Sequence, residues 1–214
     1  IFSLLVPFVS HTNDLKYIFK SGSEGYNTFR IPSIITTDSG VVLAFAEGRK
    51  NSSSDSGDID LVLKRSTDGG KTWSDLIVIR DDSTNVCGNP SPVIDRKTGK
   101  IFLLSTWNRG DDTESKIINM TSVDTRRVYV MNSIDEGLSW SNPIEITDKV
   151  KKPNWTWYAT GPVHGIQVRE GSKKGRMIIP CDHIEANTKK YYSHVIYSDD
   201  GGSSWNIGGR TPQD

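Results

Sequence analysis

An arginine and a group of aspartates near the N-terminal end are the residues whose types could do chemistry. Arg30 lies in the stretch YNTFRIP, where the proline restricts the residue before it and predicts an extended backbone. A guanidinium held in this way suits bidentate recognition of a carboxylate. The following loop, EGRKNSSSDSGDID, carries Asp55, Asp58 and Asp60, any of which could act as a proton donor. The residues alone do not choose among these three, and a solvated Ser/Asp loop is the alternative.

Three copies of one turn sequence indicate the framework around these residues. STDGGKTW (66–73), SIDEGLSW (133–140) and SDDGGSSW (198–205) all fit Ser-x-Asp-x-Gly-x-x-Trp, at intervals of 67 and 65 residues. The aspartate can accept hydrogen bonds from turn amides, the glycine can supply a positive φ, and the tryptophan can pack into a sheet while its N–H finds a partner. We interpret these Asp boxes as structural. Calcium binding is the alternative, but the oxygen ligands are too few and wrongly spaced for a recognised loop.

Strand-length runs rich in β-branched and aromatic residues alternate with turn residues along the chain, and no amphipathic helix of three turns is predicted. Hairpin turns are predicted at 37–40, 96–99 and 169–175. The predicted strands are RIPSIITT, VVLAFAEG, IDLVLKRS, LIVIRD, KIFLLSTW, RVYVMNS, PIEIT, GIQV, RMIIP and SHVIYS. The Asp-box interval equals one four-stranded unit, which predicts an all-β propeller of four-stranded antiparallel blades.

The chain length accounts for about three such blades, whereas closed propellers need at least about four. We therefore expect a fragment of a longer propeller, or a chain that needs partners to close it, because an open ring leaves sheet edges and faces unpaired. The final residues, NIGGRTPQD, are predicted to form a loop.

Composition excludes several classes of partner. Lys+Arg and Asp+Glu both total 26, so the net charge of zero gives no reason to expect nucleic acid or an anionic membrane. No apolar run approaches the roughly 20 residues that span a bilayer. The opening stretch IFSLLVPFVS is either the remainder of a signal peptide or a first strand. Cys87 and Cys181 are predicted to be buried free thiols.

Phe-Arg-Ile-Pro, followed 36 residues after Arg30 by the first Asp box, resembles the sialidase (neuraminidase) family, and in particular secreted bacterial-type exo-α-sialidases. The resemblance implies a six-bladed propeller with a central pocket, of which residues 1–214 would form part of the catalytic domain. It implies a glycosidase, secreted, periplasmic or on the cell surface, that uses no metal and no cofactor. Its substrates would be glycoproteins, glycolipids or oligosaccharides ending in sialic acid, which carries a carboxylate on its anomeric carbon.

By the same resemblance, Arg30 matches the first of three arginines that bind that carboxylate. Asp55 matches the acid/base aspartate that protonates the leaving oxygen. This role requires a carboxylic acid with a raised pKa, and a loop that closes over the substrate could desolvate it. Arg49 matches an arginine that contacts the sugar's outer hydroxyls, with an unrelated surface ion pair as the alternative.

Further candidates for the pocket wall follow from the family resemblance. Asn89, in CGNPSP, would line the side of the pocket that holds the N-acyl group, where the family often has aspartate. Trp107 would form an aromatic wall for the acetamido methyl, with a core tryptophan as the alternative. Asp182 and His183 are named only as possible lining.

The family's nucleophile is a tyrosine. A carboxylate nucleophile would meet the substrate's own carboxylate, with a repulsion of about 4 kcal/mol at 4 Å and an effective dielectric near 20. A neutral tyrosine activated by a glutamate avoids this in a retaining mechanism. None of the seven tyrosines matches the family position, so the tyrosine, its glutamate and the other two arginines are expected in a missing C-terminal half, and the 214 residues alone are expected to be inactive. The alternative is a non-catalytic propeller that acts as a sialic-acid lectin or protein-binding module.

Overall fold

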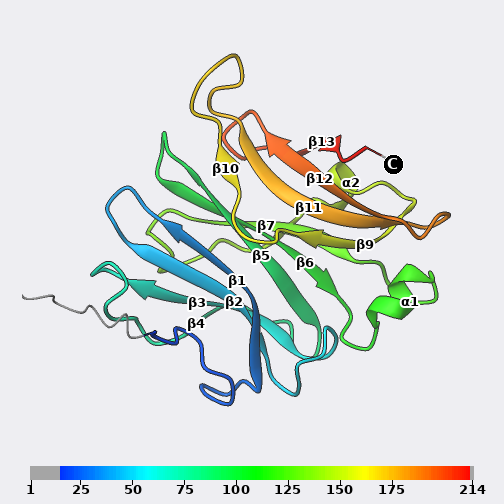
Figure 1. Cartoon of the computed structure of the whole chain (residues 1–214), viewed down its shortest axis with the longest axis horizontal. Helices are drawn as coiled ribbons and strands as arrows, with labels where there is room; N and C mark the ends of the chain where they lie inside the picture. The colour runs from blue at the N-terminus through cyan, green and yellow to red at the C-terminus, as the bar shows by residue number, and fades with distance from the viewer. Residues whose placement is uncertain (1–14, 213–214) are drawn as a thin grey trace, which may run out of the picture.

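The computed structural model describes residues 15–212, which fold into strands and two short helices (Figure 1). The strands are β1 (Thr28–Thr36), β2 (Val42–Arg49), β3 (Ile59–Ser66), β4 (Ile77–Arg80), β5 (Val86–Asp95), β6 (Lys100–Asn108), β7 (Arg127–Ser133), β8 (Ile144–Glu145), β9 (Trp155–Thr160), β10 (Ile166–Gln167), β11 (Met177–Glu185), β12 (Tyr191–Ser198) and β13 (Asn206–Arg210). The helices are α1 (Glu114–Ile118) and α2 (Thr147–Val150). The stretch predicted as a signal-peptide remnant or first strand lies outside the described residues.

The strands form antiparallel meanders in chain order. The first meander is β1 to β4 and the second is β5 to β8, and a parallel bridge between Ile59 and Val86 joins them into one sheet. In the third meander, β9 and β10 both pair with β11, which is followed by β12 and β13. Strand β5 contacts β1, β9 and β10, so the first strands of the meanders lie side by side at the centre of the molecule (Figure 1).

Apolar side chains pack between neighbouring meanders. Strand β6 shows this most clearly: Ile101 and Leu103 pack in a cluster with residues of β2 and β3, whereas Phe102 and Leu104 pack in a second cluster with residues of β9, β11 and β12. Because alternate residues of a strand point to opposite faces, both faces of the second meander are buried. This face-to-face stacking holds the central strands in place.

The predicted strands and hairpin turns are confirmed, and three strands were not predicted. They are β5, β9 and β13. The loop predicted for the last residues is wrong, because Asn206 and Ile207 pair with β12. Strand β5 contains glycine, asparagine and prolines, which strands disfavour, and it accommodates them with a register shift between Gly88 and Ser91.

The Asp boxes are turns between the third and fourth strands of each meander, as predicted. In the box at 133–140, the Gly137 amide donates to Ser133 Oγ at 2.8 Å, and the Ser139 amide donates to Asp135 Oδ1 at 2.9 Å. Gly137 has a φ of 82°. The same bonds recur in the boxes at 66–73 and 198–205. The hydrogen bond from the Ser139 hydroxyl lowers the pKa of Asp135 to about 2.

Two of the boxes also fasten one meander to the previous one. Trp140 meets Phe45 of the first meander edge-on, with ring centroids 5.9 Å apart, and Trp205 meets Phe102 of the second at 6.3 Å. The predicted tryptophan hydrogen bonds are wrong for these two, since neither buried Nε1 has a partner among the described residues. The tryptophans therefore act through packing.

Cys87 and Cys181 are buried free thiols, as predicted. Burial raises the pKa of both thiols to about 12, so they remain protonated near neutral pH. Within residues 15–212, no helix is long and apolar enough to cross a membrane.

Candidate active site

Arg30 lies on β1 at a β-bulge. The pairing with β2 shifts register between Arg30 and Ser33, and Ile31 has a φ of 51°. The extended backbone predicted from the proline restriction is therefore wrong at Ile31. A left-handed conformation is strained for a β-branched residue, and bulges of this kind redirect neighbouring side chains.

Arg30, Asp55 and Arg49 lie together. Asp55 Oδ1 accepts hydrogen bonds from Arg30 Nη1 at 3.0 Å and from Arg49 Nη2 at 2.7 Å. The Arg30 and Asp55 side chains are 43% and 49% exposed, so an incoming ligand can reach both, whereas Arg49 is only 2% exposed. The geometry thus brings together the predicted carboxylate-binding arginine and the predicted proton donor.

The rival aspartates are engaged elsewhere. Lys50 Nζ lies 3.2 Å from Asp58 and 3.1 Å from Asp60, and Tyr26 OH donates to Asp60 at 2.7 Å. Burial raises the pKa of Asp60, although the hydrogen bonds from Tyr26 and Lys50 lower it. Of the three loop aspartates, only Asp55 contacts Arg30.

Arg49 has no donor left for a ligand. Its Nε and Nη2 donate to Glu47 Oε2, its Nη1 donates to the carbonyls of Ser53 and Ser54, and its Nη2 also donates to Asp55. These are all five N–H donors of a guanidinium. Arg49 therefore shapes the loop that carries Asp55, and the predicted contact with sugar hydroxyls stays a prediction.

Asn89 connects the three meanders at the centre of the molecule. Its amide donates to Glu47 Oε1 at 2.8 Å, and its carbonyl accepts from Thr160 Oγ1 at 2.6 Å. Its side-chain Oδ1 accepts from Thr106 Oγ1 at 2.7 Å and also from Arg126 Nη2. Asn89 has a φ of 54°, a conformation that asparagine tolerates better than most residues.

Arg126 was not predicted. It is buried, its Nε donates to the Tyr158 carbonyl at 2.7 Å, and its Nη1 donates to Asn108 Oδ1 at 2.5 Å. Its guanidinium also stacks 3.9 Å from the centre of the Trp157 ring. Desolvation lowers the pKa of Arg126 to about 10, so it remains a cation. In the sequence, Arg126-Arg127 reads as a polar start to a strand, and nothing local marks its burial.

Trp107 and His183 lie apart from this cluster, whereas Asp182 interacts electrostatically with Arg126. Trp107 Nε1 donates to Asp82 at 2.6 Å, and its ring packs against the cluster between the first and second meanders. His183 is buried, with Nδ1 3.0 Å from Nδ1 of His194, so it does not line a pocket. Asp182 is partly buried, and desolvation raises its pKa to about 6 against the opposing effect of Arg126.

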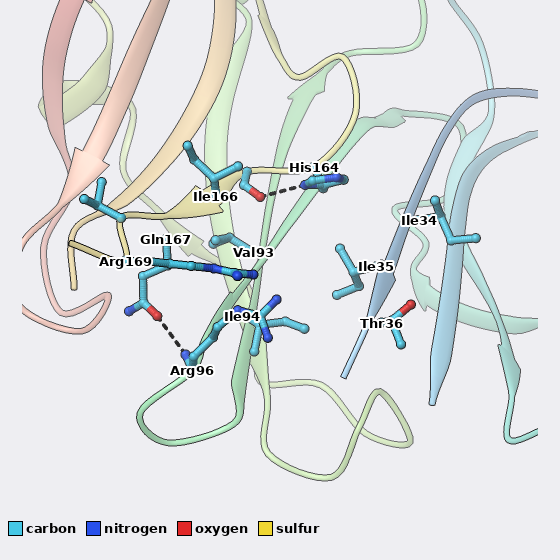
Figure 2. Close-up of a pocket in the computed structure, with 12 residues that line it drawn as sticks. Ile34, Ile35, Thr36, Val93, Ile94, Arg96, His164, Ile166, Gln167 and Arg169 are labelled. Carbon is cyan, nitrogen blue, oxygen red and sulfur yellow. Dashed lines mark hydrogen bonds between the residues drawn. The ribbon is translucent and has the colours of Figure 1, made fainter. Parts of the chain in front are cut away.

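Two cavities flank β1. One, of about 660 Å³, is lined by Arg30 and by Phe29, Val163 and His164. The other, of about 670 Å³, is drawn in Figure 2 and lies between the far end of β1, β5 and β10. Thr36 lines it and is about 20 Å along the strand from Arg30. The second cavity is lined by neither Arg30 nor Asp55, and it shares Ile34 and His164 with the first. Among the described residues, no three or more His, Cys, Asp or Glu side chains are grouped to hold a metal ion.

Stacked antiparallel meanders fastened by Asp boxes, with an arginine–aspartate pair near the central strands, define a β-propeller with a candidate site for an acidic ligand. The BNR repeat-like domain matches residues 40–213. A sialidase of Bacteroides fragilis is 32% identical over 200 residues, which is 87% of this chain and 36% of that protein. A sialidase of Clostridium perfringens is 34% identical over 217 residues, covering 95% of this chain and 55% of that protein.

Solved structures agree with this assignment. The Hadza microbial sialidase Hz136 superposes with a TM-score of 0.80 at 30% identity, covering 90% of this chain and 39% of that one. The chain therefore belongs to the BNR repeat-like family, as a member of its bacterial-type sialidases. It spans between about a third and just over half of the length of the two curated relatives.

Proposed function

We propose that this chain contributes the carboxylate-binding arginine and the proton donor of an exo-α-sialidase. The observation that carries the proposal is the hydrogen bond of 3.0 Å from Arg30 Nη1 to Asp55 Oδ1. Both side chains in this pair are about half-exposed. A carboxylate-binding arginine and a general acid must lie within one sugar ring of each other, because the carboxylate and the leaving oxygen share the anomeric carbon.

In the ligand-free protein, Asp55 occupies the partner position on Arg30. We infer that the sialic-acid carboxylate replaces it there through a charge-assisted hydrogen bond. Asp55 is then released from one of its two cationic neighbours. In its protonated form it donates a proton to the leaving glycosidic oxygen as that bond breaks.

The nucleophile of this retaining mechanism is proposed to be a tyrosine activated by a glutamate, both from the rest of a six-bladed propeller. The described tyrosine hydroxyls support this, because three of them have partners other than Asp55. Tyr26 OH bonds Asp60, Tyr129 OH bonds Glu145, and Tyr158 OH contacts His194. The proposed substrates are sialylated glycoproteins, glycolipids or oligosaccharides met outside the cytoplasm.

Hydrolysis of two α-sialosides by the protein that contains this chain tests the proposal. A general acid matters most when the leaving group is poor, so Asp55→Asn should lower kcat/KM for an alkyl sialoside by roughly 10²- to 10⁴-fold and for an activated aryl sialoside by much less. Asp58→Asn is the matched control, because Asp58 lies in the same loop but bonds Lys50. Equal losses for both substrates would exclude Asp55 as the acid. If the wild-type protein binds both sialosides but hydrolyses neither, the result would favour the alternative of a non-catalytic sialic-acid lectin.

A further inference from the structure

Lys151 is a buried lysine that directly follows α2. It is only 8% exposed, and its Nζ donates to Thr125 Oγ1 and, at 2.8 Å, to the Arg126 carbonyl. No carboxylate among the described residues forms an ion pair with it, and the nearby Asp124 is paired with Arg127. Lys151 is therefore a buried amine without a paired counter-charge.

The two acceptors suit a neutral amine. An ammonium has three N–H donors, whereas a neutral amine has two N–H groups and a lone pair. With Thr125 and Arg126 as acceptors, the neutral form keeps both hydrogen bonds and leaves its lone pair in the third position. Burial lowers the pKa of Lys151 to about 7, with Arg126 and Arg127 acting in the same direction and Asp124 against it. About half of these side chains are then neutral at pH 7, against fewer than about one in a thousand for a lysine in water.

A cavity of about 620 Å³ gives access to this amine. The cavity lies between α1, the segment that follows α1, and the segment from α2 to the start of β9, and both Lys151 and Thr125 line it. Thr125 is exposed, whereas Arg126 is buried, so the Lys151 amine lies where the protein interior meets the cavity. The other charged residues that line the cavity are Asp124, Asp148 and Lys152.

We propose that Lys151 is a nucleophilic lysine that binds small aldehydes covalently as an imine. Its lone pair attacks the carbonyl carbon, so that a C–N bond forms and the π electrons of the C=O bond move to the oxygen. The two amine protons end on that oxygen, which leaves as water while the C=N bond forms. Desolvation and neighbouring cations are the conditions that activate a lysine for this attack. The inference goes beyond the proposed function, because the cavity is lined by neither Arg30 nor Asp55.

Reductive labelling tests the proposal without any variant. The protein that contains this chain is treated with acetaldehyde and cyanoborohydride, which reduces an imine to a stable secondary amine, and peptide mass spectrometry maps the modified lysines. At pH 7, Lys151 should be labelled tenfold or more faster than Lys152, its exposed neighbour. The rate at Lys151 should level off above about pH 8, where the amine is almost entirely neutral. Equal rates at the two lysines, or a label at Lys152 alone, would overturn the proposal.

A charge placed beside the amine gives a second test. Thr125→Asp puts a carboxylate where the hydroxyl accepts from Lys151, which should raise the pKa of the lysine. At pH 7, Lys151 in this variant should be labelled about fivefold or more slowly than in Thr125→Asn, a control of matched size without the charge. Equal labelling of the two variants would contradict the role of the missing counter-charge. Neither measurement involves a sialoside, so a failure of the proposed function would leave this inference standing.

Discussion

Asp55 Oδ1 accepts hydrogen bonds from two arginines in very different environments. Arg30 is half-exposed and holds Asp55 with one bond, whereas buried Arg49 is saturated by Glu47, the loop carbonyls and Asp55. An exposed ion pair is weak and easily exchanged, whereas a buried and fully bonded one is rigid. Arg30 is thus suited to release Asp55 for a ligand, and Arg49 to keep the loop in place.

The buried pair of Glu47 and Arg49 should dominate the stability of this region. Both side chains are at most 3% exposed, so Glu47→Gln removes the buried counter-charge of Arg49 and leaves it only the half-exposed Asp55. We expect the free energy of unfolding to fall by about 3 kcal/mol. The control is Asp38→Asn, because Asp38 pairs with Arg96 on the surface and should cost less than about 1 kcal/mol. Urea unfolding measures the loss of unfolding free energy in both variants. Equal losses would contradict a dominant role of the buried Glu47–Arg49 pair in the stability of this region.

At the residue scale, the sequence predicts the site residues that belong to a recognised motif, including buried Arg49, but not Glu47 and Arg126. Arg30 and Asp55 follow from a motif and its spacing to the first Asp box. Glu47 and Arg126 have no such signal, because their roles depend on Asn89, which lies 42 and 37 residues away from them in the chain. The choice of Asp55 over its neighbours also required the family resemblance, since Ser/Asp loops look alike.

At the element scale, the Asp box is both a turn and a contact between meanders. Its hydrogen bonds join residues within eight positions, so the turn could be predicted from the sequence. The contacts of Trp140 and Trp205 with the preceding meander could not, because they depend on how the sheets stack. Strand β5 was not predicted for a related reason: tertiary pairing outweighs the poor strand propensity of its glycine, asparagine and prolines.

Two glycine substitutions separate the turn from the contact. Gly70 and Gly202 have φ values of 88° and 84°, so alanine strains both turns alike, by about 1–2 kcal/mol. A Cβ at Gly70 meets nothing nearer than 3.8 Å, whereas at Gly202 it lies 2.2 Å from the Phe102 ring. Gly202→Ala should therefore destabilise the protein by about 1–3 kcal/mol more than Gly70→Ala. Thermal unfolding compares them, and matching melting temperatures would argue against the box as an inter-meander contact.

The histidine pair on β11 and β12 should make stability pH-dependent. Burial lowers the pKa of His183 to about 4 and of His194 to about 3, whereas an unfolded histidine titrates near 6.5. Between these values the unfolded chain binds more protons, so acidification below pH 6.5 removes about 1.4 kcal/mol per pH unit for each histidine.

The test of the histidine pair is the difference between wild type and His194→Gln, followed by denaturant unfolding from pH 7 to pH 5. The raised pKa of Asp182, about 6, works in the opposite direction and is common to both proteins, so it cancels in the difference. The variant should lose less stability on acidification. Parallel pH profiles would show that His194 is not held neutral in the folded protein.

At the scale of the whole molecule, the stacked meanders converge on their first strands, and this is where Arg30 and Asn89 lie (Figure 1). The propeller fold could be predicted from the Asp-box interval, because that interval equals the length of one four-stranded meander. The arrangement of the site was not, since it forms where β1, β5 and β9 meet. Asn89 bonds residues of the first and third meanders, so the site and the fold share one set of contacts.

The most direct test of the role of Arg30 is the affinity of the protein that contains this chain for a 2,3-didehydro sialic acid, compared with its affinity for the methyl ester of that ligand. Arg30 and Arg96 are equally exposed, at 43%, and each pairs with one exposed aspartate, which makes Arg96→Met a matched control for Arg30→Met. We expect the acid to bind tenfold or more tightly than the ester, and we expect Arg30→Met, but not Arg96→Met, to reduce that difference severalfold. An acid–ester difference that is absent in the wild type, or that is unchanged in Arg30→Met, would contradict the assignment of Arg30 as a carboxylate-binding residue.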